Sequence, residues 1–212
     1  MSETFERLPD EKKELITKTC LQEFGRKSYQ DANTDVIVKN SDISKGSLYY
    51  YFGNKKGVYL YILKISLQRL VSTQYTDDTQ ITTFHDVLQS AWNNKIKQVK
   101  QYPLETVFVN NAAKERCEEV YKEKEEVLQD YMDKGRERSY RTLEKALLSC
   151  NLKKNTDLKI AVKGLSIYLN SIIMECLKKY SDKPMVLFEE SDSVFAEMEQ
   201  YLQIFLNGII AK

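Results

Sequence analysis

The chain has 212 residues, of which 42% are hydrophobic and 30% charged, and its formal net charge at neutral pH is +1. This composition suits a soluble protein with a real core, and the balanced charge excludes nucleic-acid binding through bulk basicity. Only 3 prolines and 7 glycines occur, which favours long helices, and no apolar stretch is long enough to predict a membrane span.

Three short helices followed by a longer one are predicted at the start of the chain. The first spans residues 10–25, where apolar side chains recur at helical spacing. Asn33 and Ser44 are favoured N-cap residues, and each opens one of the next two helices. The third helix ends at Gly53, and a longer helix begins near Lys55. The second and third helices are separated by only a few residues, as a helix-turn-helix requires.

The middle of the chain predicts a body of further helices. Thr83 can cap a helix that ends just before Pro103, because the residue before a proline avoids helical geometry. A short helix over residues 104–115 and a long, charged one over about 118–149 follow. Gly135 lies inside the long helix, where it costs about 1 kcal/mol relative to alanine, so a kink or break is expected there as an alternative to a continuous helix.

The last two helices, over residues 156–180 and 190–210, carry more apolar positions than one buried face needs. The first of them has a continuous stripe and a second, displaced stripe made of Ile160, Ile167 and Met174. Two stripes predict burial against the protein's own core and against a partner subunit, since cyclic dimers are the commonest oligomers. A helix buried centrally in one monomer is the alternative. The residues predicted to form the dimer interface are Leu165, Ile172, Met198, Leu202 and Phe205.

Residues 32–62 carry the most specific signal, and they read ANTDVIVKNSDISKGSLYYYFGNKKGVYLYI. This segment resembles the helix-turn-helix of the TetR/AcrR family of transcriptional regulators. The resemblance rests on Ile37, on the run from Ile43 to Phe52 and on the residues Asn54-Lys55-Lys56 that open the next helix. It covers roughly a quarter of the chain at good quality, and the rest matches only in the number and length of its helices.

This resemblance implies an all-α fold with two parts. An N-terminal three-helix helix-turn-helix domain over residues 1–56 would bind DNA. A larger C-terminal helical domain over residues 57–212 would bind a small-molecule effector and dimerise through its last two helices. The implied function is transcription regulation by a homodimer that binds a palindromic, double-stranded operator. A repressor released by its effector is the form that the family favours.

The chemistry of the same segment supports DNA binding independently. No acidic residue occurs from Ile43 to Thr76, so the local charge suits a surface that faces phosphates. Ser44, as an N-cap, leaves backbone amides at the helix terminus for a phosphate. Gly46 has no side chain and lets the backbone approach the duplex closely. The side chains expected to project toward the major groove are Lys45, Ser47 and Tyr50.

Further phosphate contacts follow from the resemblance, which assigns Tyr49 and Lys55 as clamps on the DNA backbone and Thr34 as another phosphate contact. Lys55 can also belong to an ordinary solvated helix start, although cations are mildly unfavourable at that end of a helix. Three adjacent tyrosines on a short helix cannot all be buried on one face. Leu48 and Phe52, four residues apart, are the better core candidates, so at least one tyrosine is expected to be exposed.

Aromatic residues of the helical body are the candidates for an effector pocket, because ligand sites favour apolar walls with a few hydroxyl groups. The same residues can equally fill a helical core. No buried charge stands out among them, so the expected effector is largely neutral or aromatic. The residues predicted to bind it are Trp92, Tyr102, Phe108, Tyr121, Tyr131 and Tyr168.

Enzyme classes have little support in the residues. The one histidine, His85, has no matched nucleophile, no glycine-rich phosphate loop occurs, and the four cysteines stand alone. We therefore expect no catalysis, cofactor or metal, and reduced thiols, although a redox-sensing cysteine stays open. The first residues do not form a signal peptide, so a cytoplasmic protein is expected. A helical adaptor that binds protein instead of DNA is the second alternative function.

Overall fold

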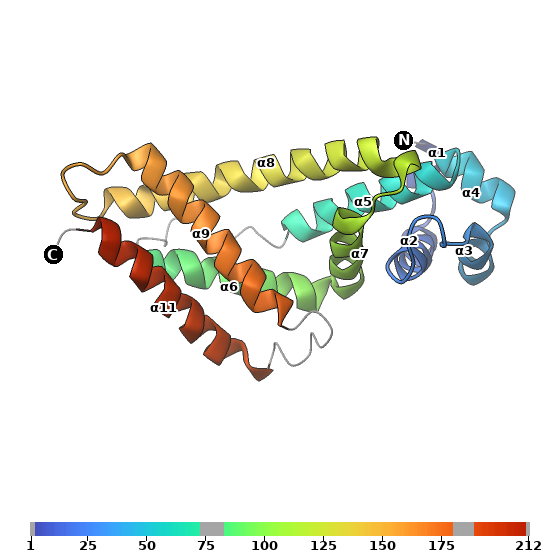
Figure 1. Cartoon of the computed structure of the whole chain (residues 1–212). Helices are drawn as coiled ribbons and strands as arrows, with labels where there is room; N and C mark the ends of the chain where they lie inside the picture. Colours follow the sequence, from blue (N-terminus) through green and yellow to red (C-terminus); the bar gives the residue numbers. More distant parts are fainter. Residues whose placement is uncertain (1–2, 73–82, 180–188, 211–212) are drawn as a thin grey trace. The chain divides into compact units, whose positions relative to one another are not determined.

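The computed structural model of the protein describes residues 3–72, 83–179 and 189–210 (Figure 1). Every helix or strand named within these ranges is an α-helix, so the all-α class predicted from the sequence is confirmed. Among the described residues, no helix is long and apolar enough to cross a membrane. The chain forms two compact units, and each has an apolar core of its own.

The first unit comprises Met1–Tyr75 and Gln98–Met132. Within it, α2 packs against α3, α5 and α7, and α4 packs against α3 and α5. Two helices, α6 and α8, continue from this unit into the second one. The helices of the first unit are α1 (Glu3–Glu6), α2 (Asp10–Phe24), α3 (Thr34–Ser41), α4 (Lys45–Phe52), α5 (Lys55–Ser72), α7 (Pro103–Lys114) and parts of α6 (Phe84–Gln101) and α8 (Glu118–Leu148).

The short helices begin and end where the sequence predicted. The Asn33 side chain accepts a hydrogen bond from the Asp35 amide at 2.8 Å, which caps α3. Ser44 Oγ accepts from the Ser47 amide at 2.9 Å and caps α4 in the same way. Gly53 ends α4 with φ at 81°, a left-handed conformation that favours glycine. Both predicted caps are therefore confirmed.

A charged contact joins three helices of the first unit. The Arg69 guanidinium of α5 donates to a Glu105 oxygen of α7 at 2.7 Å and to a Glu14 oxygen of α2 at 2.5 Å. Glu105 is almost fully buried, so this arginine neutralises a carboxylate that would be costly to bury alone. The contact fixes α2 to α5 and α7.

The second unit comprises Thr76–Lys97 and Asp133–Lys212, and its last two described helices are α9 (Leu158–Lys178) and α11 (Ser191–Ile209). These two helices pack against each other. Residue 180, the predicted end of the first of them, lies outside the described residues. The long α8 runs unbroken through Gly135, so the continuous alternative holds at that position.

Candidate DNA-binding interface

Helix α4 has one face in the core and one face in solvent. Leu48 is fully buried, and Phe52 packs against the same core from a half-buried position. Tyr50 is 70% exposed, and Lys45 and Gly46 before it are also exposed. The expectation that Leu48 and Phe52 face the core while one tyrosine faces solvent is confirmed. The helix is therefore packed along one side and open along the side that carries the residues predicted to read DNA.

The N-terminus of α4 offers backbone donors to solvent. The first hydrogen bond of the helix runs from the Leu48 amide to the Ser44 carbonyl, and the Ser47 amide is taken by the Ser44 side chain. The amides of Lys45 and Gly46 precede these bonds at an exposed helix start. The positive end of the α4 helix dipole and these two amides together suit an anion such as a phosphate.

Gly46 is not required by the packing of the protein. A Cβ atom built at this position would meet only Ser44 Oγ, at an ordinary 3.7 Å. Its φ does not lie in the left-handed region that favours glycine. Alanine therefore fits the protein, and a glycine here suits the close approach of another molecule to the backbone.

The three predicted phosphate-contact residues also hold the helix-turn-helix together. Thr34 is buried at the start of α3, and its hydroxyl lies 3.0 Å from the Tyr49 hydroxyl of α4. Lys55 Nζ donates to the Gln30 carbonyl at 3.1 Å and lies 4.9 Å from the centre of the Tyr29 ring. Contact of these residues with DNA stays a prediction, and each would need to share or exchange its present partner.

Two lysines near the exposed face are paired with carboxylates. Lys45 forms an ion pair with Asp35 at 2.8 Å, and both side chains are at least half exposed. The hydrogen bond that Lys45 donates to the Asp35 carboxylate raises the pKa of Lys45, which keeps this lysine charged. Lys56 pairs with Glu123 of α8 at 2.6 Å. The sequence pattern missed both carboxylates because they come from other helices.

The six residues predicted to bind an effector are divided between the two units. Phe108 is fully buried in the first core, whereas Tyr121 is 41% exposed. Trp92 Nε1 donates to Ser191 Oγ at 3.0 Å, and the Tyr168 hydroxyl donates to the Tyr201 carbonyl at 2.9 Å, both in the second unit. Tyr102 and Tyr131 belong to the first unit and are half-buried. Neither unit alone brings all six together, and their role stays a prediction.

The residues predicted to form a dimer interface face the second core. Leu165, Met198 and Leu202 are essentially fully buried, Ile172 is 7% exposed, and the half-buried Phe205 stacks on Tyr168. The displaced stripe is the one in solvent. Its members are the exposed side chains of Ile160 (70%), Ile167 (58%) and Met174 (65%) on α9, and Ile204 (68%) accompanies them on α11.

These exposures explain the two stripes of α9 by burial on one side and exposure on the other. The five interface residues stay a prediction, and their burial within the unit leaves the exposed stripe as the surface that a second subunit can reach. The sequence showed both stripes, but periodicity alone cannot say which of two apolar faces meets the protein's own core.

Two of the four cysteines are poor nucleophiles. Burial raises the pKa of the Cys20 thiol to about 12, and burial also raises the pKa of Cys176. The thiolate is the reactive form of cysteine, so these two positions do not suit a redox sensor. In the described part of the chain, no group of three or more His, Cys, Asp or Glu residues could hold a metal ion.

Comparison with known sequences places the strongest similarity over the segment that contains α3 and α4. Residues 16–62 match the family model of bacterial regulatory proteins, tetR family. Over 88 residues, the chain is 30% identical to the Bacillus subtilis (strain 168) protein YuxN, described as an uncharacterized HTH-type transcriptional regulator. That match covers 40% of this chain and 30% of the length of YuxN.

Comparison with solved structures shows that the fold is shared along the whole chain. A TetR family transcriptional regulator from Chloroflexus aurantiacus J-10-fl gives a TM-score of 0.69 at 20% identity, covering 100% of this chain and 99% of that one. SmeT, the repressor of the Stenotrophomonas maltophilia efflux pump SmeDEF, gives 0.62 at 16% identity, with 98% and 93% covered. The complex of SmeT with triclosan gives 0.64 at 16% identity, with 96% and 93% covered.

Proposed function

Because the chain belongs to the TetR family of bacterial regulatory proteins, we propose that it is a cytoplasmic transcriptional repressor without catalytic activity. It binds a palindromic double-stranded operator as a homodimer and leaves the operator when a small-molecule effector binds. Residues 1–56 form the DNA-binding part in this proposal, and residues 57–212 form the part that dimerises and binds the effector.

The observation that carries the proposal is the two-sided environment of α4. Its inner side is anchored by Leu48, and its outer side presents Tyr50 beside an exposed, serine-capped N-terminus. A helix of this kind enters the major groove with its first residues nearest to the bases. Lys45, Ser47 and Tyr50 supply the donors for bases or phosphates there.

Phosphate contacts position such a helix on the duplex without reading sequence. We assign this role to the amides at the start of α4 and to Thr34, Tyr49 and Lys55. Lys45 has an additional part, because its ion pair with Asp35 is solvent-exposed and worth little in water. A phosphate or a guanine edge can therefore replace Asp35 as the partner of Lys45 at a small cost in free energy.

The dimer forms through α9 and α11. Ile160, Ile167, Met174 and Ile204 are aliphatic side chains in solvent, and two copies would bury them against each other. Two recognition helices then meet one face of the duplex when their half-sites lie one helical turn, about 34–36 Å, or a multiple of it apart.

The effector acts by a population shift. A ligand that binds better to dimers with a different spacing of the recognition helices lowers operator affinity by the same coupling free energy. SmeT has a solved complex with triclosan, which is a precedent for a small, largely apolar ligand in this fold. The aromatic residues of the body support a largely neutral or aromatic effector for this chain.

Fluorescence anisotropy with duplex DNA from upstream of the chain's own gene tests the proposal. The expected result is binding that is tighter than to a scrambled duplex and that weakens steeply with salt. Equal affinity for both duplexes, or no binding at low salt, would favour the helical adaptor that binds protein instead of DNA.

A further inference from the structure

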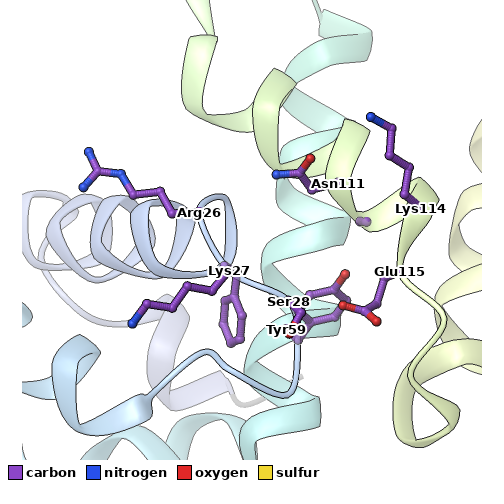
Figure 2. Close-up of a pocket in the computed structure, with 9 residues that line it drawn as sticks. Arg26, Lys27, Ser28, Tyr59, Asn111, Lys114 and Glu115 are labelled. Atoms are coloured by element: carbon purple, nitrogen blue, oxygen red, sulfur yellow. The ribbon is translucent and has the colours of Figure 1, made fainter. Parts of the chain in front are cut away.

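A pocket of about 330 Å³ lies in the first unit between the end of α2 and α7 (Figure 2). Phe24, Tyr59 and Ala112 supply its apolar walls, and the other lining residues are polar or charged. Its volume lies at the lower end of the range for small-ligand sites. None of the six residues predicted to bind the effector lines this pocket, although one of them, Phe108, packs against the wall residues Phe24 and Tyr59.

The only carboxylate that lines the pocket already accepts three hydrogen bonds from backbone amides. Glu115 accepts hydrogen bonds from the backbone amides of Tyr29 at 2.7 Å and of Arg116 and Cys117 at 2.9 Å. Burial alone would raise the pKa of Glu115, but these amides hold it below the usual value. The Glu115 carboxylate therefore accepts hydrogen bonds mainly from the protein backbone, and few acceptor positions remain for a ligand.

The cationic side chains of the pocket have fewer partners than Glu115 has. Arg26 and Lys27 follow the end of α2, and Lys114 comes from the last turn of α7 (Figure 2). Lys27 pairs with Glu23 at 2.7 Å. Arg26 and Lys114 have no ion-pair partner among the residues that the structure describes. The lining thus carries positive charge that its own carboxylate does not neutralise.

Asn111 adds a neutral donor to the lining. Asn111 Nδ2 donates one hydrogen to the Gly25 carbonyl at 2.7 Å, which satisfies that carbonyl and leaves the second amide hydrogen available. We propose that the pocket binds a small organic anion, with its acidic group near Asn111 and the cationic side chains of Arg26, Lys27 and Lys114 that line the pocket. The apolar part of the ligand rests on the rings of Phe24 and Tyr59.

Occupancy of this pocket is coupled to the DNA-binding segment. The Glu23 carboxylate that holds Lys27 also accepts a hydrogen bond from the Asn33 amide at 2.8 Å, and Asn33 caps α3. An anion that attracts Lys27 weakens its bond to Glu23 and so alters the contact at the start of α3. A small acid bound here would therefore modulate DNA binding from a pocket that none of the six predicted effector residues lines.

The test is a titration of the full chain with 2-naphthoate, followed by backbone amide NMR, with neutral 2-naphthamide as the matched probe. We expect naphthoate to shift the amide signals of Ser28 and Asn111 and to bind at least about fivefold more tightly than naphthamide. The double variant Arg26→Gln/Lys114→Gln should weaken naphthoate binding about tenfold, or about 1.4 kcal/mol. Lys18→Gln, an exposed change on α2 outside the pocket, should leave it unchanged.

Three results would overturn the proposal. Equal affinity for naphthamide would show that charge is not recognised, and unchanged affinity in the double variant would place the acid elsewhere. No shift at about 10 mM naphthoate would show that the three cations only complement the carbonyl ends of α2 and α7. Both replaced side chains are solvent-exposed, so a thermal melt that matches the wild-type protein is the check that the double variant folds.

Discussion

Helix α4 and the helix pair α9 and α11 both expose large apolar side chains, but the two surfaces differ in kind. On α4 the exposed residue is Tyr50, which has a hydroxyl and lies beside a capped helix start with available amides. On α9 and α11 most of the exposed apolar residues are aliphatic, as at Ile167 and Ile204, and Tyr201 of α11 is the exposed aromatic residue among them. Each helix has a second face in its own core.

The comparison shows that an exposed apolar side chain indicates a contact surface. The chemical nature of that side chain then indicates which class of partner the surface binds. An aromatic hydroxyl among donors can meet the edges of bases and the oxygens of phosphates. An aliphatic stripe gains nothing from such a partner and is stabilised only by another apolar surface. Changes on the two surfaces should therefore separate dimerisation from DNA recognition.

The largest effect is expected from Ile167→Asp on α9. An acid in the exposed stripe would be buried without a partner in the dimer, so the protein should become a soluble monomer. Operator affinity should fall about 10²- to 10⁴-fold, because the two recognition helices no longer bind together. Sedimentation velocity and anisotropy measure these two quantities.

A matched change on another exposed apolar residue is the control for that variant. Met132→Asp replaces a side chain that is 54% exposed on α8, and it should leave the dimer intact. In contrast, Ile172→Asp places an acid in the second core and should give insoluble protein. A dimeric Ile167→Asp protein would move the interface away from the exposed stripe.

Tyr50→Ala is expected to have the next largest effect. Loss of a base contact costs about 1–3 kcal/mol, so operator affinity should fall roughly 5- to 150-fold while binding to a scrambled duplex changes little. The melting temperature should not change, since the side chain is 70% exposed. An equal loss on both duplexes would reassign Tyr50 to the DNA backbone.

Gly46→Ala isolates the close approach of α4 to the duplex. The added methyl group fits the free protein, and alanine favours a helix, so stability should be equal or slightly higher. Operator affinity should nevertheless fall about tenfold, or about 1.4 kcal/mol. Gly135→Ala in α8, where a Cβ meets nothing within 4 Å, is the control for the glycine-to-alanine change itself.

The smallest effect is expected from Lys55→Ala. If Lys55 contacts a phosphate, affinity should fall alike for all sequences, and the slope of log affinity against log salt should decrease by about one. Because Lys55 also donates to the Gln30 carbonyl, a thermal melt must accompany the titration. A loss confined to one base pair of the operator would contradict the phosphate role.

Much of the DNA-binding segment could be predicted because its signals are local. Asn33 and Ser44 are side chains that bond to amides two or three residues away, and Gly53 satisfies a conformation at its own position. A single sequence displays such patterns directly. The family resemblance over the same segment added the assignment of DNA contacts.

The parts of the fold and of the candidate site that were not predicted depend on contacts between residues distant in the sequence. Arg69 joins Glu14 and Glu105, which no helical spacing relates to it, and Lys45 joins Asp35 of the preceding helix. The aromatic residues of the body gave no hint of their division between two units. Periodicity states that a side is apolar, but the neighbouring helix decides whether that side becomes core or surface.

The claim that the outer face of α4 meets DNA is tested most directly by amide hydrogen exchange, measured with and without an operator duplex. We expect slower exchange over residues 34–56, strongest at the start of α4, and unchanged exchange in α9 and α11. Unchanged exchange over residues 44–52 while the duplex is fully bound would contradict the assignment of α4 as the recognition helix.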